Sequence, residues 1–178
     1  MSSQITTPKC DKDLIAEIRE DSKSAFQLLF HKYYKRLVEF CFYRLRNLDS
    51  SKDLVQEIFT NLWISRKKLD PKKSIKSYLY KSATNRLINL SKHSSSKSLT
   101  LDDSILVNQK RVNEEIEDKI DIYTSIEKLP QKMKTVFMLS RNEGFKYSEI
   151  ADICNISIKA VEKRMTKALR LLRKSILK

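Results

Sequence analysis

The chain of 178 residues contains a single glycine, Gly144. Tight β-hairpin turns depend on glycine, and the phosphate-binding loops of dinucleotide and P-loop proteins need at least two glycines in one short motif. One glycine therefore argues against a β-rich fold and excludes both kinds of loop. The chain has only three prolines, and 40% of its residues are hydrophobic, which is enough to build cores. These features predict an all-α protein.

The sequence also lacks the histidine and cysteine clusters of metal-binding proteins and the long apolar runs of membrane proteins. Its two histidines lie far apart, at positions 31 and 93, and its three cysteines form no Cys-x-x-Cys pair. We therefore expect no metal, no cofactor and no disulfide framework, and free thiols suit a reducing cytoplasm. Apolar runs reach only four residues, so we expect neither a signal peptide nor insertion into a membrane. The predicted location is cytoplasmic.

The formal net charge of +14 and a sequence pI near 9.7 indicate a polyanionic partner. Residues 1–95 carry 19 basic and 10 acidic side chains, and residues 120–178 carry 13 and 6. Residues 96–119, by contrast, carry 4 basic and 6 acidic side chains and follow a serine-rich stretch. We expect two small helical domains, at 13–95 and 120–178, joined by a flexible acidic linker over 96–119.

Apolar residues in the first block recur at spacings of three and four, as in amphipathic helices. A break is expected near Asp21 and another at Pro71, and Ser50 or Ser51 is the expected N-cap of the third helix. The predicted helices span residues 13–30, 32–47, 51–67 and 74–91.

The second block has the pattern of a helix-turn-helix at residues 147–165. Helices are expected around 118–128 and 131–143, and Gly144 is expected in the left-handed conformation that ends the second of them. Asn155 stands at the turn, where asparagine tolerates left-handed backbone, and Ser157 is the expected N-cap of the following helix. The residues expected to fill the corner between the two short helices are Ile150, Cys154, Ile156, Val161 and Met165. The small Ala151 is expected where the two helices approach closely.

The helix that follows Ser157 displays mainly basic side chains. Such a helix fits the major groove of DNA, with N-terminal side chains at base edges and others on phosphates. A plain helical hairpin with a solvated basic face is the alternative. The small Ala151, the turn residue Asn155 and the N-cap Ser157 occur together with a basic second helix, and this combination favours DNA binding.

Two helices of the first block carry polar patterns of different kinds. One is an acidic strip at helical spacing, formed by Asp53, Gln56, Glu57, Thr60, Asn61 and Ile64. Within a basic block it suits a basic protein partner, although a solvated outer face is the simpler interpretation. The helix at 74–91 interleaves tyrosines with cationic residues, a pattern suited to stacking on unpaired bases. For Tyr80, a place in the core is an equal alternative.

These motifs together resemble the sigma-70 family. The string at 53–63, Asp-Leu-Val-Gln-Glu-Ile-Phe-Thr-Asn-Leu-Trp, is similar to the family's core-polymerase-binding helix. Residues 77–86 resemble its −10 promoter helix, and residues 129–172 resemble its −35-binding domain. The order and compactness of these motifs match the extracytoplasmic function (ECF) sigma factors, which have only these two domains.

The resemblance implies a bacterial transcription initiation factor that binds core RNA polymerase, directs promoter-specific initiation and is not an enzyme. It also implies an anti-sigma factor as partner. The core-polymerase-binding residues it implies are Asp53, Gln56, Glu57 and Asn61. Those for the −10 non-template strand are Lys76, Tyr78, Lys81, Asn85 and Arg86. Those for the −35 duplex are Lys159, Glu162, Lys163, Arg164, Thr166 and Lys167.

Two residues of the last helix depart from the family pattern. Glu162 and Thr166 stand where arginine or other residues are frequent, so the promoter sequence does not carry over from relatives. A stand-alone helix-turn-helix regulator with an N-terminal partner-binding domain is the alternative function, but it gives no reason for the acidic strip. A nuclease would need clustered carboxylates or histidines on one face, and the pattern outside the acidic linker provides none.

Overall fold

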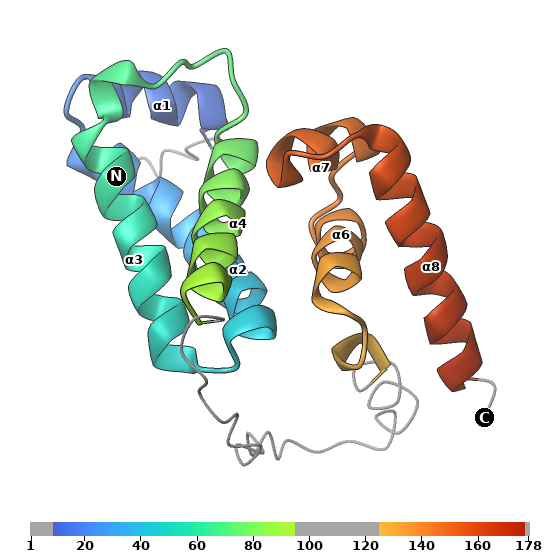
Figure 1. Cartoon of the computed structure of the whole chain (residues 1–178). Helices are drawn as coiled ribbons and strands as arrows, with labels where there is room; N and C mark the ends of the chain where they lie inside the picture. Colours follow the sequence, from blue (N-terminus) through green and yellow to red (C-terminus); the bar gives the residue numbers. More distant parts are fainter. Residues whose placement is uncertain (1–8, 95–124, 177–178) are drawn as a thin grey trace, which may run out of the picture. The chain divides into compact units, whose positions relative to one another are not determined.

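The computed structural model describes residues 9–94 and 125–176. Within these residues all regular secondary structure is helical, as the near absence of glycine predicts (Figure 1). The chain divides into two compact units, residues 1–87 and 88–178. The expected linker at 96–119 lies outside the described residues, and the domain boundaries at 95 and 120 stay predictions.

The first unit is built from four α-helices and one short 3-10 helix. These are α1 (Asp11–Arg19), α2 (Lys23–Leu45), α3 (Leu48–Ile64), the 3-10 helix Arg66–Lys68 and α4 (Ile75–Ser94). The division between the units falls within α4, after Leu87.

The break near Asp21 is confirmed, but the two helices expected on either side of residue 31 form one. Asp21 has a left-handed φ of 67°, and the Ser22 side chain caps α2 by accepting from the Ala25 N–H at 3.3 Å. From there α2 runs unbroken to Leu45. No glycine or proline interrupts it, and buried Leu29, Tyr33 and Leu37 keep a spacing of four across the expected gap.

The start of α3 also differs from the expectation, because Asn47 caps it rather than Ser50 or Ser51. The Asn47 side-chain oxygen accepts from the Ser50 N–H at 2.8 Å. The buried Ser51 hydroxyl instead donates to the Asn47 carbonyl at 2.6 Å. Asparagine is as good an N-cap as serine, and capping from position 47 lets Leu48 and the acidic Asp49 form the first turn.

The core of the first unit lies between α2 and α3, with α1 and α4 packed against them. Tyr80 belongs to this core: it is fully buried and meets Phe40 of α2 edge-on, with ring centroids 5.2 Å apart. At the C-terminal end of α3, Arg66 lies over the Trp63 ring, 4.5 Å from its centroid, and forms an ion pair with Asp21. This pairing joins the end of α3 to the turn between α1 and α2.

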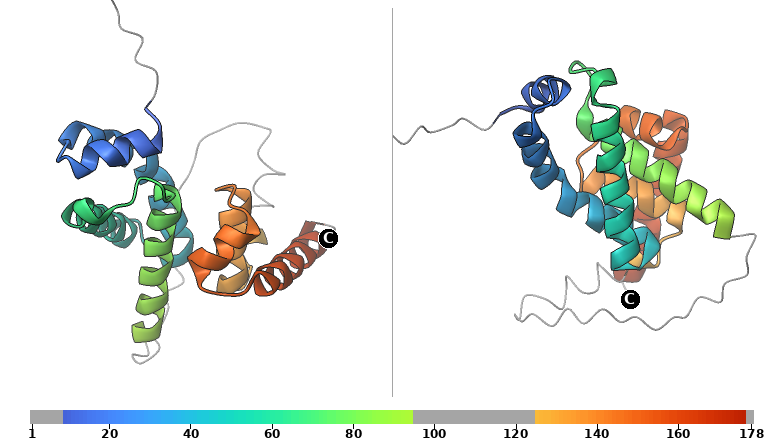
Figure 2. Two further views of the ribbon diagram at one scale, coloured as in Figure 1. Left: turned by 90° about the horizontal axis from the view of Figure 1, so that it is seen from above. Right: turned by 90° about the vertical axis from the view of Figure 1, so that its left-hand side faces the viewer.

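The second unit is a three-helix cluster of α6 (Gln131–Arg141), α7 (Tyr147–Cys154) and α8 (Ile158–Ile176). Each helix packs against the other two, and they stay together in both views of Figure 2. Gly144 has the expected left-handed φ of 71°, although α6 ends at Arg141, two residues earlier than expected. The core residues include Val136, Leu139, Ile150, Val161 and Ala168, all fully buried.

Two hydrogen bonds attach Ser125 and Glu127 to the three-helix cluster. The buried Lys134 amine donates to the Glu127 carbonyl at 2.7 Å, and the Ser175 hydroxyl donates to Ser125 at 2.6 Å. Residues 125–127 are helical. Lys128, the last residue of the helix expected around 118–128, is in a turn, and residues 118–124 lie outside the described residues.

Candidate nucleic-acid and polymerase interfaces

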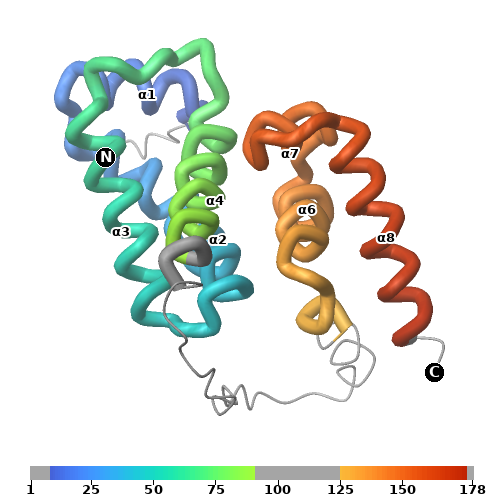
Figure 3. Tube along the Cα trace, viewed as in Figure 1, coloured from blue at the N-terminus to red at the C-terminus, as the bar shows by residue number. Residues whose placement is uncertain are grey.

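The turn between α7 and α8 has the geometry predicted for a helix-turn-helix (Figure 3). Asn155 adopts left-handed backbone, with φ 51° and ψ 53°, and the Ile156 N–H bonds the Ala151 carbonyl at 3.0 Å. Ser157 then caps α8, its side chain accepting from the Ala160 N–H at 3.2 Å. These local bonds set the direction in which α8 leaves the turn.

One side of α8 is buried and the other is exposed. The buried side is a stripe of Val161, Met165, Ala168 and Leu172 at spacings of four, three and four. Five of the six predicted DNA-contacting residues are exposed, namely Lys159, Glu162, Lys163, Thr166 and Lys167. Arg164 is half-buried. At 100° per residue it stands about 160° round the helix from Glu162, so Arg164 lies beside the buried stripe and not on the same face as Glu162.

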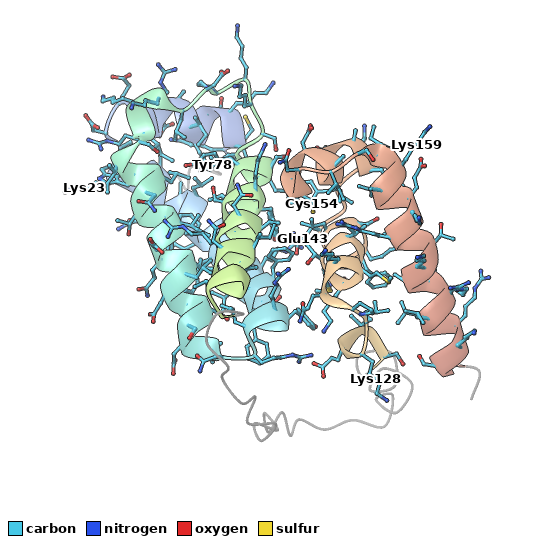
Figure 4. The ribbon with its side chains drawn as sticks, in the orientation of Figure 1. Lys23, Tyr78, Lys128, Glu143, Cys154 and Lys159 are labelled. Carbon is cyan, nitrogen blue, oxygen red and sulfur yellow. The ribbon has the colours of Figure 1, made fainter. Side chains whose placement is uncertain are left out.

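Ile158 is a surface residue that the sequence pattern did not single out. It lies three residues before the buried Val161, yet 47% of Ile158 is exposed. Together with Lys159, Glu162, Lys163 and Thr166 it occupies an arc of about 140° on the first turns of α8. Figure 4 shows Lys159 at this N-terminal end of the helix. Ile158 could have been identified from the sequence as a large aliphatic residue at the N-terminus of the predicted recognition helix.

The acidic strip of α3 lies on the surface of the first unit. Asp53, Gln56, Glu57 and Asn61 are all exposed, opposite the buried Leu54, Ile58 and Leu62 stripe. Ile64, at the end of the strip, is 70% exposed. The strip therefore presents carboxylates, amides and one aliphatic side chain together, a composition that a protein surface can contact.

On α4, neighbouring tyrosines have opposite environments. Tyr78 is exposed near the N-terminal end of the helix (Figure 4), whereas Tyr80 is in the core. Lys81 and Asn85 are also exposed. Lys76 and Arg86 are half-buried, and Arg86 forms an ion pair with Glu57 of α3.

Within residues 9–94 and 125–176, no group of histidine, cysteine and carboxylate side chains could hold a metal ion. The helices in the same described ranges are too short or too polar to cross a membrane.

Comparison with known proteins gives the two units their identity. Residues 29–96 match the family model for sigma-70 region 2, and residues 119–172 match the model for sigma-70 region 4. The first range contains α3 and α4, and the second contains the helix-turn-helix. The chain therefore belongs to the sigma-70 family, as an ECF sigma factor with region 2 and region 4 domains.

Full-length relatives agree with this assignment. The chain is 24% identical to the ECF RNA polymerase sigma factor SigW of Bacillus subtilis, covering 93% of this chain and 96% of SigW. It is 23% identical to the ECF RNA polymerase sigma-E factor of Haemophilus influenzae, covering 99% and 98%. As a sigma factor, the protein directs transcription initiation through RNA polymerase, binding core polymerase and promoters, and is not an enzyme.

Solved structures share the fold. CnrH, determined in complex with the cytosolic domain of CnrY, matches with a TM-score of 0.68 and 21% identity, covering 92% of this chain and 95% of CnrH. RpoE of Bartonella quintana, determined with the anti-sigma factor NepR, matches with a TM-score of 0.69 and 18% identity, covering 85% and 96%.

Proposed function

We propose that the protein divides promoter recognition between its two units: α8 binds the −35 duplex, α4 binds the separated −10 non-template strand, and α3 docks on core polymerase. The observation that carries this proposal is the pair of surfaces on α8. A continuous apolar stripe holds the helix to its own unit, while a mainly basic face is left exposed beside a capped helix-turn-helix. A helix held in this way can enter a major groove with its N-terminal residues at base edges.

The exposed Tyr78, with Lys81 and Asn85, supports the role of α4. A stacked base needs a free aromatic face, and cations beside it follow the phosphates of the strand. Tyr80 cannot take this role without leaving the core, so Tyr78 is the proposed stacking residue.

The exposed strip of Asp53, Gln56, Glu57 and Asn61 supports the role of α3. Carboxylates on the surface of a strongly basic chain favour a partner surface that is itself basic, through complementary charge.

We also propose an anti-sigma factor as partner and the cytoplasm as location. Support comes from the two solved relatives, whose structures were determined with an anti-sigma factor and with a cytosolic domain. Both proposals are tested by pull-down from fractionated cells of the source organism.

The decisive experiment for the main proposal is run-off transcription with core polymerase, with and without this protein. We expect specific transcripts only when the protein is present and the template carries a cognate −35 and −10 element. A scrambled −35 template is the control for non-specific initiation. Specific DNA binding that needs no polymerase and yields no transcript would instead favour a stand-alone regulator.

A further inference from the structure

Glu162 is the only acidic residue of α8, which otherwise displays lysine and arginine along its exposed side. It is exposed and makes no ion pair or hydrogen bond within the described residues, although Lys159 and Lys163 are close in the sequence. A carboxylate aimed at DNA is repelled by the phosphates. A carboxylate can be accommodated in the groove only where a base offers it a hydrogen-bond donor.

The hydrogen-bonding groups that bases present in the major groove limit which base Glu162 can contact. An ionised carboxylate only accepts hydrogen bonds, so the guanine N7 and O6 and the thymine O4, which are acceptors, are disfavoured opposite it. Donors are offered by the amino groups of cytosine and adenine, and the carboxylate–cytosine N4 contact is the usual pairing. Glu162 thus selects for cytosine and against guanine and thymine.

Ile158 lies one turn before Glu162 on the same side of the helix. Residues four apart are neighbours on a helix surface, and they are separated by about 6 Å of rise, less than two base-pair steps. An exposed aliphatic side chain at a groove edge has one apolar partner on DNA, the C5-methyl group of thymine.

We propose that Glu162 and Ile158 form a pyrimidine-selective pair in the −35 element, with Glu162 accepting from a cytosine N4 amino group and Ile158 packing on a thymine methyl within two base pairs of it. This inference rests on the proposed role of α8 at the −35 duplex. It specifies a base preference that follows from the two residues of this chain.

The test is selection of −35 sequences by reconstituted holoenzyme. Promoter duplexes with a fixed −10 element and a randomised −35 region are bound, recovered and sequenced, first with the natural chain. We expect one position enriched for cytosine and a thymine within two base pairs of it. Glutamine pairs with adenine through N6 and N7, so Glu162→Gln should move that one position from cytosine to adenine.

Glu127→Gln is the matched control, since it makes the same chemical change at an exposed residue of the same unit. Its selected sequences should equal those of the natural chain. A base profile without cytosine, or one that Glu162→Gln leaves unchanged, would overturn the proposal while leaving −35 recognition intact. Failure of the natural holoenzyme to enrich any −35 sequence would overturn the proposed role of α8 itself.

Replacing the selected thymine by uracil tests Ile158 separately, because uracil lacks only the methyl group. The natural holoenzyme should lose about fourfold in affinity, as for one buried methyl group. The Ile158→Ala holoenzyme should bind the two duplexes equally. Equal binding of both duplexes by the natural holoenzyme would remove Ile158 from the proposal.

Discussion

Glu57 of α3 and Arg86 of α4 form an ion pair that joins the two surfaces we assign to polymerase and to the −10 strand. Their side chains are 52% and 41% exposed, so the pair contributes only about 0–1 kcal/mol to stability. Its position matters more than its strength. A residue proposed to meet polymerase and a residue proposed to meet DNA are direct neighbours in the first unit.

Charge reversal on α3 should separate polymerase binding from folding. We expect Asp53→Lys with Glu57→Lys to abolish co-purification with core polymerase, because both exposed carboxylates then oppose a basic partner. The melting temperature should change little, since the lost pair is a surface one. Undiminished co-purification would contradict the assignment of the strip.

A swapped pair is the control for the neighbouring arginine. Glu57→Lys combined with Arg86→Glu keeps an ion pair between these two positions. Any loss of polymerase binding that persists in this variant is therefore caused by the changed charge of the α3 strip and not by loss of the ion pair.

The two DNA-facing helices should respond differently to the state of the DNA. Lys163→Ala is expected to weaken holoenzyme binding to duplex −35 DNA by about 1–3 kcal/mol and to leave binding to a pre-melted −10 fragment unchanged. Tyr78→Ala is expected to do the reverse, by about 1–3 kcal/mol, through loss of base stacking. Affinities for both fragments at fixed salt are the measurement. Equal weakening of both fragments by both variants would refute this division.

The region 4 unit should fold in isolation. A fragment of residues 120–178 contains α6, α7 and α8 with their shared core, so we expect a helical circular dichroism spectrum and a cooperative melt. Its binding to duplex DNA should be weak and should fall steeply with salt, because phosphate contacts release counterions. A disordered fragment, or an affinity insensitive to salt, would count against the prediction.

The turn of the helix-turn-helix should depend on Asn155. Left-handed backbone disfavours residues with a Cβ by roughly 1–2 kcal/mol, apart from asparagine and aspartate. Asn155→Ala should therefore lower the free energy of unfolding by about that amount, measured in urea, whereas Asn155→Gly should be close to neutral. If both substitutions cost the same, the side chain rather than the backbone conformation is what the site requires.

Thiol reactivity should distinguish the two cysteines of the first unit. Burial raises the pKa of the Cys41 thiol to about 12, and the thiolate is the reactive form, so Cys41 should stay unlabelled by iodoacetamide at pH 8 in the folded protein. Exposed Cys10 should react first. Mass mapping of the cysteine-containing peptides follows each thiol separately, including the half-exposed Cys154 of the second unit. Cys10→Ser should remove the fastest phase, and urea should make Cys41 reactive. Rapid labelling of Cys41 without denaturant would disprove the buried environment.

Several features followed from the sequence alone because their causes are local. Gly144 and Asn155 were predicted in left-handed backbone and Ser157 as an N-cap, and the structure confirms all three. The spacing of apolar residues likewise predicted that Val161 and Met165 are buried, and the structure leaves five of the six predicted DNA-contacting residues exposed, with Arg164 half-buried. Each depends on residues within one or two turns of one another, where helical periodicity and capping chemistry act directly.

Tertiary structure decided the features that depend on residues distant in the sequence. Tyr78 and Tyr80 look alike in the sequence, and only the packing of α4 against other helices, including the contact with Phe40 of α2, buries Tyr80. The Glu57–Arg86 pair spans two helices, so neither helix's own pattern predicts it. Periodicity describes the faces of one helix, whereas burial and pairing depend on which other helix covers each face, and that is settled only when the helices pack.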